Sequence, residues 1–407
     1  MPSRSQSSAG EIAGRQSAGA VFAAFLQLGC TAFGGPVAHL GYFREAFVVR
    51  RRWLDDRAYA DLVALCQFLP GPASSQVGMA IGLAKAGPLG MLAAWVAFTA
   101  PSALLLIAFG YGVTTYREFM PDGVLHGLKV VAVAVVAQAV WGMARSLCPD
   151  RPRMTMALLA AIAALMAPTP LTQILIILAG AAAGLAGLKA EDSKGKGSLP
   201  IAIGRGWAVA ALALFAALLA GLPLAAAAGS SHALDLIDSF YRTGALVFGG
   251  GHVVLPLLQA EVVPPGWVGN DAFLAGYGAA QAVPGPLFTF AAYLGTVGET
   301  APNGWAGGLI CLLAVFVPSF LLVAGALPFW EGLRHRSGVR RALMGVNAAV
   351  VGLLLAALYD PVWTSAIHRP ADLALGLAAL AALAVWKVPP WAVVIATAAG
   401  GWALAAA

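Results

Sequence analysis

Charged residues are scarce in this sequence. Only 10% of its 407 residues are charged, against about 25% in an average soluble domain, and 60% are hydrophobic. A soluble chain of this length could not cover its surface with so few charges, which excludes that class and indicates a membrane protein. The net charge of +6 does not indicate a nucleic-acid partner. The positive charges stand in short loops between apolar runs, a pattern that orients helices in a lipid bilayer.

Cysteine is also scarce. Cys30, Cys66, Cys148 and Cys311 are scattered singly, without a C-x-x-C pair or a Cys/His cluster. This spacing argues against a disulfide framework, a zinc site or a thiol redox centre, and we expect no metal and no cofactor. The stretch 1–17 lacks the apolar run and cleavage site of a signal peptide, and we expect a disordered cytoplasmic tail there.

Long apolar runs are plentiful, and about 20 apolar residues cross a bilayer as a helix. The sequence predicts membrane helices at 87–113, 123–147, 206–228, 304–327, 343–358 and 389–405, and shorter apolar helices at 154–167, 170–188 and 372–386. The polar interval 189–205 is rich in Gly, Ser and Lys, which is typical of a linker. We therefore divide the chain into a tail 1–17, a first repeat 18–188, a linker and connecting membrane helix 189–228, and a second repeat 229–407.

Four further apolar stretches are interrupted near their middle by Gly and Pro. The interruptions are Gly34-Gly35-Pro36 in 21–49, Pro70-Gly71-Pro72 in 58–84, Gly249-Gly250-Gly251 in 236–262 and Pro284-Gly285-Pro286 in 272–298. Each piece beside an interruption has roughly 13 residues, or some 20 Å of helix, which is too short to cross the bilayer.

The interruptions recur at an offset of 214 or 215 residues, which indicates an internal duplication. Further matches follow in the same order: Trp53 with Trp267, Pro101-Ser102 with Pro318-Ser319, and Gly127-Leu128-Lys129 with Gly345-Val346-Asn347. One departure is that Gly251 stands where the first repeat has Pro36, which puts equal roles for the two halves in doubt.

Basic segments indicate how the repeats face. They are 44–57 with five Arg, 145–153 with three Arg, 189–205 with three Lys and one Arg, and 334–341 with four Arg. If each interrupted stretch crosses once, 44–57 and 189–205 fall on opposite faces. If the stretches are re-entrant hairpins, all basic segments share one face, as the positive-inside rule demands, and we prefer this topology. In both topologies the helix at 206–228 inverts the second repeat. The prediction is an all-α polytopic membrane protein whose two inverted repeats place broken helices near mid-membrane, as in secondary transporters.

The Phe-Gly-Gly-Pro and Gln-x-x-Pro-Gly-Pro motifs, the Trp53 and Trp267 pair and the Gly-x-Lys/Asn pair resemble the chromate ion transporter family in its long, two-domain bacterial form. The resemblance covers about residues 20 to 360. It implies a multi-pass protein of the bacterial inner membrane that exports chromate from the cytoplasm and confers chromate resistance, with sulfate as the competing or exchanged anion. The N-terminus is expected in the cytoplasm, and a homodimer is kept as a partner hypothesis.

Chromate is a tetrahedral dianion that needs convergent donors. A helix that begins at a Gly/Pro interruption presents free N–H groups and the positive end of its dipole, and Gly allows close approach of the backbone. The predicted site therefore comprises Gly34, Gly35, Pro36, Pro70, Gly71, Pro72, Gly249, Gly250, Gly251, Pro284, Gly285 and Pro286. The competing interpretation is that these residues only kink packed helices.

Polar side chains near the interruptions complete the predicted site: Gln67, Gln281, Ser74, Ser75, Thr289, Lys129, Asn347 and His252. For each of them a structural role is the alternative. Lys129 stands out because a charge inside an apolar span costs about 2.5–3.5 kcal/mol on insertion scales, although Lys129 is near enough to the start of its span to reach the surface. His39 is a weaker candidate for carrying a coupled proton.

Three other functions stay open at this point. A membrane enzyme such as a chromate reductase would need a flavin, haem or thiol centre, and the sequence has no dinucleotide fingerprint. An anion channel shares broken helices with transporters, so sequence separates the two poorly. A sulfate importer that takes chromate as a stray substrate is the third.

Overall fold

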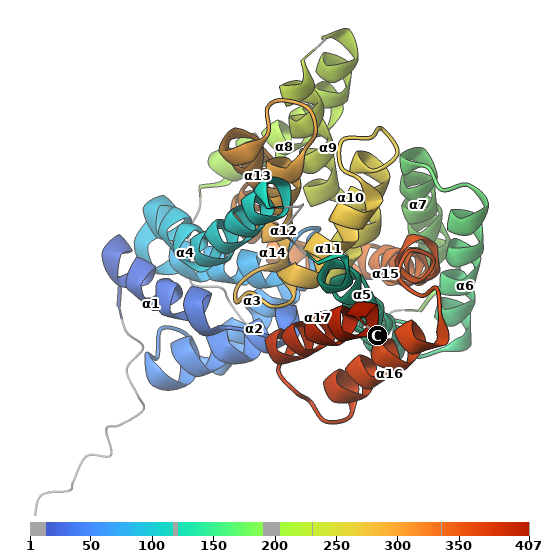
Figure 1. Ribbon diagram of the computed structural model, residues 1–407. Coiled ribbons are helices and arrows are strands. Elements are labelled where there is room, and N and C mark those ends of the chain that lie inside the picture. The colour runs from blue at the N-terminus through green and yellow to red at the C-terminus, as the bar shows by residue number, and fades with distance from the viewer. Residues whose placement is uncertain (1–13, 117–120, 190–203, 230, 335, 407) are drawn as a thin grey trace, which may run out of the picture.

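The computed structural model describes residues 14–116, 121–189, 204–229, 231–334 and 336–406. Every regular element in these ranges is a helix, which confirms the predicted all-α class (Figure 1). The helices are α1 (Ala18–Thr31), α2 (Gly35–Arg44), α3 (Asp56–Phe68), α4 (Ala73–Thr115), α5 (Asp122–Leu147), α6 (Arg151–Met166), α7 (Pro170–Gly187), α8 (Arg205–Ala228), α9 (His232–Leu246), α10 (Val254–Val262), α11 (Asn270–Ala280), α12 (Phe290–Val297), α13 (Gly304–Ala326), α14 (Trp330–Arg334), α15 (Ser337–Ala357), α16 (Pro370–Ala384) and α17 (Pro390–Ala406).

Among the described residues, six helices are long and apolar enough to cross a membrane: α4, α5, α7, α8, α13 and α15. The chain is therefore a polytopic membrane protein. The helix expected at 87–113 is not separate, because α4 also contains the segment that follows the Pro70-Gly71-Pro72 interruption. The two arms of α4 meet at a kink, where Gly87 has a φ of 64° that glycine adopts readily. Close contact between Gly82 and Gly90 packs the arms against each other.

All four interruptions separate helices as predicted. The first separates α1 from α2, and the second separates α3 from α4. The third separates α9 from a short 3-10 turn before α10, and the fourth separates α11 from a similar turn before α12. Each break contains a glycine with a left-handed φ angle, which is 101° at Gly34, 118° at Gly71, 78° at Gly249 and 99° at Gly285. Gly rather than another residue is required there because a side chain disfavours that region.

Aromatic side chains from the two arms of the first broken stretch contact each other. Phe25 of α1 lies 5.5 Å between ring centroids from Phe43 of α2, and 4.7 Å from Phe47 in the π-helical turn that continues α2. These ring contacts join the segments on either side of the break, while most of the packing of α1 is against α4. The re-entrant topology, in which both ends of each broken stretch lie on one face of the bilayer, stays a prediction.

The two repeats are intertwined. The last helices of the first repeat, α6 and α7, pack against α15, and the last helices of the second, α16 and α17, pack against α5. Gly127 of α5 lies against the Thr397 carbonyl, and its repeat equivalent Gly345 lies against the Gly180 carbonyl. The proposed domain limits stay predictions, and 1–13 of the tail and 190–203 of the linker lie outside the described residues.

Candidate functional site

The four interruptions meet and are joined across the repeats. The Gly71 N–H donates to the Val247 carbonyl at 2.7 Å, and the Gly285 N–H donates to the Ala32 carbonyl at 2.9 Å. Gly71 and Gly285 are repeat equivalents, as are Ala32 and Val247, so the two bonds form a symmetric pair. Because both N–H groups are engaged within the protein, they are removed from the predicted set of free backbone donors.

The two glycine-rich breaks also touch each other. A Cβ built on Gly251 would lie 3.0 Å from Pro36 Cγ, and one built on Gly35 would lie 4.0 Å from His252 Nε2. Residues about 215 positions apart in sequence thus form one cluster, which the repeat alone did not establish.

A symmetric pair of serines closes on the two Pro-Gly-Pro turns. A Cβ on Gly285 would lie 2.8 Å from Ser102 Oγ, and a Cβ on Gly71 would lie 2.7 Å from Ser319 Oγ. Each serine belongs to one of the matched Pro-Ser pairs, and each faces the turn of the other repeat. The glycines are therefore required by space as well as by φ.

A cavity of about 180 Å³, here called the central cavity, opens beside this cluster. It is large enough for several water molecules or one small tetrahedral anion. Five predicted residues line it: Gly34, Gly35, His252, Gln281 and Gly285. The remaining lining comes from α5, from the fourth break and from the ends of α16 and α17: Val135, Gln138, Ala139, Ala280, Val283, Leu287, Leu383 and Pro390.

The polar groups of the central cavity can donate hydrogen bonds without carrying a formal charge. The Gln281 amide makes one long hydrogen bond, 3.4 Å from Nε2 to the Tyr277 carbonyl. His252 Nδ1 lies 2.8 Å from the Tyr277 hydroxyl, which leaves Nε2 directed toward Gly35. Helix α2 begins at Gly35 without a side-chain cap, so its first-turn N–H groups add positive potential. No Lys or Arg is found among the described lining residues.

Other predicted residues do not line the central cavity. Gln67, the repeat equivalent of Gln281, is exposed near the end of α3. Asn347 lies beside Gly249, where a Cβ would be 3.5 Å from its Oδ1. The other break residues, Pro36, Pro70, Gly71, Pro72, Gly249, Gly250, Gly251, Pro284 and Pro286, form the turns around the cavity without lining it.

None of the three hydroxyl residues predicted for the site, Ser74, Ser75 and Thr289, lines the central cavity. The Thr289 hydroxyl donates to the Pro286 carbonyl at 2.7 Å. Ser74 Oγ lies 3.3 Å from His39 Nδ1, and the other ring nitrogen of His39 lies 3.2 Å from the Ala32 carbonyl, so His39 braces the first break. The Ser75 hydroxyl is buried and has no partner among the described residues.

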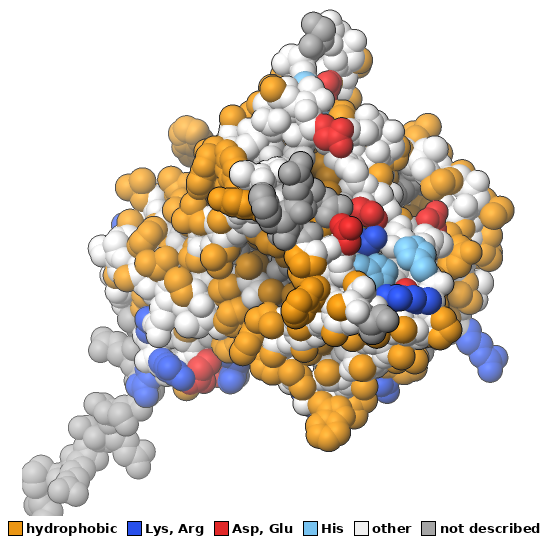
Figure 2. All heavy atoms as spheres, viewed as in Figure 1, with side chains coloured by type: hydrophobic (Ala, Val, Ile, Leu, Met, Phe, Trp, Pro, Cys, Tyr) orange, Lys and Arg blue, Asp and Glu red, His pale blue; other side chains and the backbone are white. Residues whose placement is uncertain are grey.

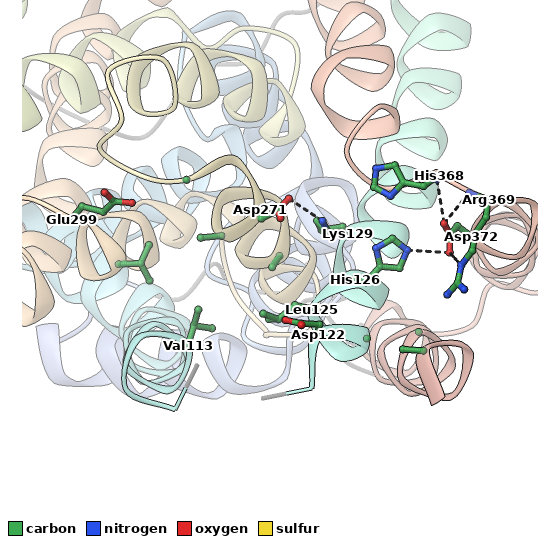
Figure 3. Close-up of a pocket in the computed structure, with 17 residues that line it drawn as sticks. Val113, Asp122, Leu125, His126, Lys129, Asp271, Glu299, His368, Arg369 and Asp372 are labelled. Carbon is green, nitrogen blue, oxygen red and sulfur yellow. Dashed lines mark hydrogen bonds and ion pairs between the residues drawn. The ribbon is translucent and has the colours of Figure 1, made fainter. Parts of the chain in front are cut away.

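Lys129 lies in a different cavity of about 570 Å³, here called the vestibule. Figure 2 shows the acidic, basic and histidine side chains of this region gathered on one face of the molecule. Lys129 Nζ is 2.8 Å from Asp271 Oδ1, and His126 Nε2 is 3.0 Å from Asp372 Oδ1 (Figure 3). Lys129 therefore does not line the central cavity with the residues of the breaks, because α5 carries it about two turns before Val135, which does line that cavity.

The model of the family described as chromate transporter matches residues 19–185 and 234–402, one match in each repeat.

The protein belongs to the chromate transporter family.

Relatives of this protein match along most of the chain. A chromate transport protein of Pseudomonas aeruginosa is 29% identical over 94% of this chain and 91% of its own length. One of Cupriavidus metallidurans is 25% identical over 89% and 87%. An uncharacterized transporter of Methanocaldococcus jannaschii is 26% identical over 83% and 82%. No solved structure matches this member of the family.

Sequence reasoning missed several residues that line the two cavities of this transporter. Gln138 and Leu383 meet only because α16 of the second repeat packs on α5, with a 3.4 Å bond from Gln138 Nε2 to the Leu383 carbonyl. The spacing of His126 and Lys129, three residues apart on one face of a helix, was a usable signal for the vestibule.

Proposed function

We propose that this transporter exports chromate from the cytoplasm and that the central cavity binds the anion during transport. The observation that carries the proposal is the convergence of the breaks on a cavity that offers the Gln281 amide, His252 and the first turn of α2. Neutral donors suit a transported dianion. They replace its hydration without a fixed counter-ion that would hold it too tightly for release.

The topology in this proposal follows the positive-inside rule. Helix α5 carries Lys129 in the vestibule near its start and Gln138 in the central cavity nearer its middle, and the basic segment 145–153 begins in its last turn. With the basic segments in the cytoplasm, the vestibule opens to the outside and the N-terminus is cytoplasmic. In this topology the four broken stretches are re-entrant hairpins of two inverted repeats.

The membrane potential favours export. With the interior negative, each charge that leaves gains about 2.3 kcal/mol per 100 mV, so a dianion gains about 4.6 kcal/mol. At tenfold per 1.4 kcal/mol, this supports a gradient of roughly a thousandfold without any coupled ion. Entry of a proton in exchange would add to this gradient, whereas one-for-one exchange for sulfate is electroneutral and would be driven by the sulfate gradient in place of the potential.

A flux assay on membrane vesicles tests the function. Inverted vesicles with this protein should accumulate radiolabelled chromate faster than vesicles without it, and sulfate and molybdate are added as competitors. Cells that express the protein should also accumulate less chromate than control cells. Equal accumulation in both pairs would refute export, and sulfate uptake that chromate does not inhibit would assign the site to sulfate instead.

A further inference from the structure

A packed apolar layer borders the vestibule through Ala275 and the central cavity through Val135 and Leu383. Buried residues of α5 and α11, which are Leu128, Val131, Ala275 and Ala279, form this layer with side chains of α16 and α17. Gly278 brings α11 into close contact with the Leu128 carbonyl. An anion in the vestibule therefore occupies a place distinct from the central cavity, although α5 lines both.

Two ion pairs in the vestibule differ in how they are held. In the first, Lys129 is nearly buried, with 11% of its side chain exposed, whereas its partner Asp271 has 73% exposed. Asp271 sits on the rim at the start of α11, and Figure 3 shows its carboxylate reaching inward to Lys129. The Lys129 ammonium therefore lies inside the cavity, whereas most of the Asp271 side chain is exposed to solvent.

The second pair is part of the fold. Asp372 is buried with 1% of its side chain exposed, and it accepts hydrogen bonds from the His368 and Arg369 N–H groups, both at 3.1 Å. Arg369 Nε and His126 Nε2 complete its shell at 3.2 Å and 3.0 Å. These bonds cap the start of α16, so Asp372 cannot leave without exposing several buried donors.

Because Asp271 is exposed and Asp372 is buried, an incoming anion can displace Asp271 but not Asp372. An exposed carboxylate regains its hydration when it leaves, and exposed ion pairs contribute little. A nearly buried ammonium left without a partner is costly, so Lys129 needs an anion at all times. A dianion that enters the vestibule satisfies this need with twice the charge of Asp271.

We propose that Lys129 forms a second binding site for tetrahedral oxyanions and that Asp271 is its exchangeable counter-ion. The anion class rests on the proposed function, but the site does not use the central cavity. Glu299 and Asp122 also line the vestibule, and their negative charge keeps the bound anion weakly held, which suits a site passed during release. When the anion departs, Asp271 returns to Lys129.

Equilibrium binding of radiolabelled sulfate and of chromate to the full-length protein in lipid nanodiscs tests this site. The measurements are made in a Gln281→Glu background, which places a carboxylate in the central cavity and leaves the vestibule unchanged. Asp271→Asn should tighten anion binding about tenfold, because it removes the competitor while keeping size and exposure. Lys129→Gln should abolish binding, and Lys129→Arg should retain it within a fewfold.

The matched control is Glu299→Gln, because Glu299 lines the vestibule and forms no ion pair with Lys129. It should tighten binding by less than threefold. Unchanged affinity in Asp271→Asn, or equal tightening in Glu299→Gln, would overturn the exchange of counter-ions, and anion binding that survives Lys129→Gln would overturn the site. If the Gln281→Glu protein still transports chromate, the central cavity is refuted, whereas the vestibule is judged on the Lys129 and Asp271 variants alone.

Discussion

Gln281→Glu should abolish chromate transport while leaving the fold intact. The substitution keeps the size of the side chain, and the amide it replaces makes only the 3.4 Å bond to the Tyr277 carbonyl. In the central cavity the new carboxylate would stand about 5 Å from a bound anion. At an effective dielectric constant of about 20, repulsion is about 3 kcal/mol per unit charge and about 6–7 kcal/mol for a dianion. Affinity should therefore fall by more than a thousandfold.

The repeat supplies the matched control for this prediction. Gln67→Glu makes the same chemical change at the equivalent position of the first repeat, but Gln67 is exposed and does not line the central cavity. Initial rates of chromate uptake into inverted vesicles should be unchanged within about twofold for Gln67→Glu. The reasoning is refuted if Gln281→Glu transports within tenfold of the unaltered protein, or if the two variants lose activity equally.

Two further predictions concern the break and the topology. Gly285→Leu should abolish transport, because a Cβ there would lie 2.8 Å from Ser102 Oγ and the φ of 99° disfavours a side chain. Gly221 on α8 has open space around it, so Gly221→Leu should leave the rate unchanged in the same uptake assay. Transport by the Gly285→Leu protein would contradict this account of the packing. In a Cys30→Ser background, membrane-impermeant thiol reagents should label cysteines at Arg57 and Lys189 from one face and a cysteine at Glu299 from the other. If the cysteines introduced at positions 57 and 189 were labelled from opposite faces, the re-entrant hairpins would be refuted.

The breaks were predictable because their cause is local. Gly and Pro end helices through their own backbone chemistry, so the sequence located each break within a few residues of the observed helix ends. The pairing of breaks was also visible, because duplication leaves a constant offset. The hydrogen bonds that join Gly71 to Val247 and Gly285 to Ala32 were beyond sequence, since they depend on how two repeats face each other.

The side chains of the site were less predictable. Gln67 and Gln281 stand at equivalent sequence positions, yet only Gln281 lines the central cavity. The sequence repeat does not determine which helices pack around each of the two positions. Lys129 was identified from the sequence as an unusual charge in an apolar span, but the cavity that it lines was not predictable. Its surroundings come from α11, α16 and α17, which are far from it in sequence and which packing alone brings to the start of α5.

The most direct measurement of the central claim is the position of chromium in a crystal of the protein grown with chromate, located by anomalous scattering at the chromium edge. We predict a peak in the central cavity, within hydrogen-bonding reach of the Gln281 amide and beside Gly35. A peak in the vestibule alone, or one elsewhere in the molecule with the central cavity empty, would contradict the claim that the four breaks form the transport site.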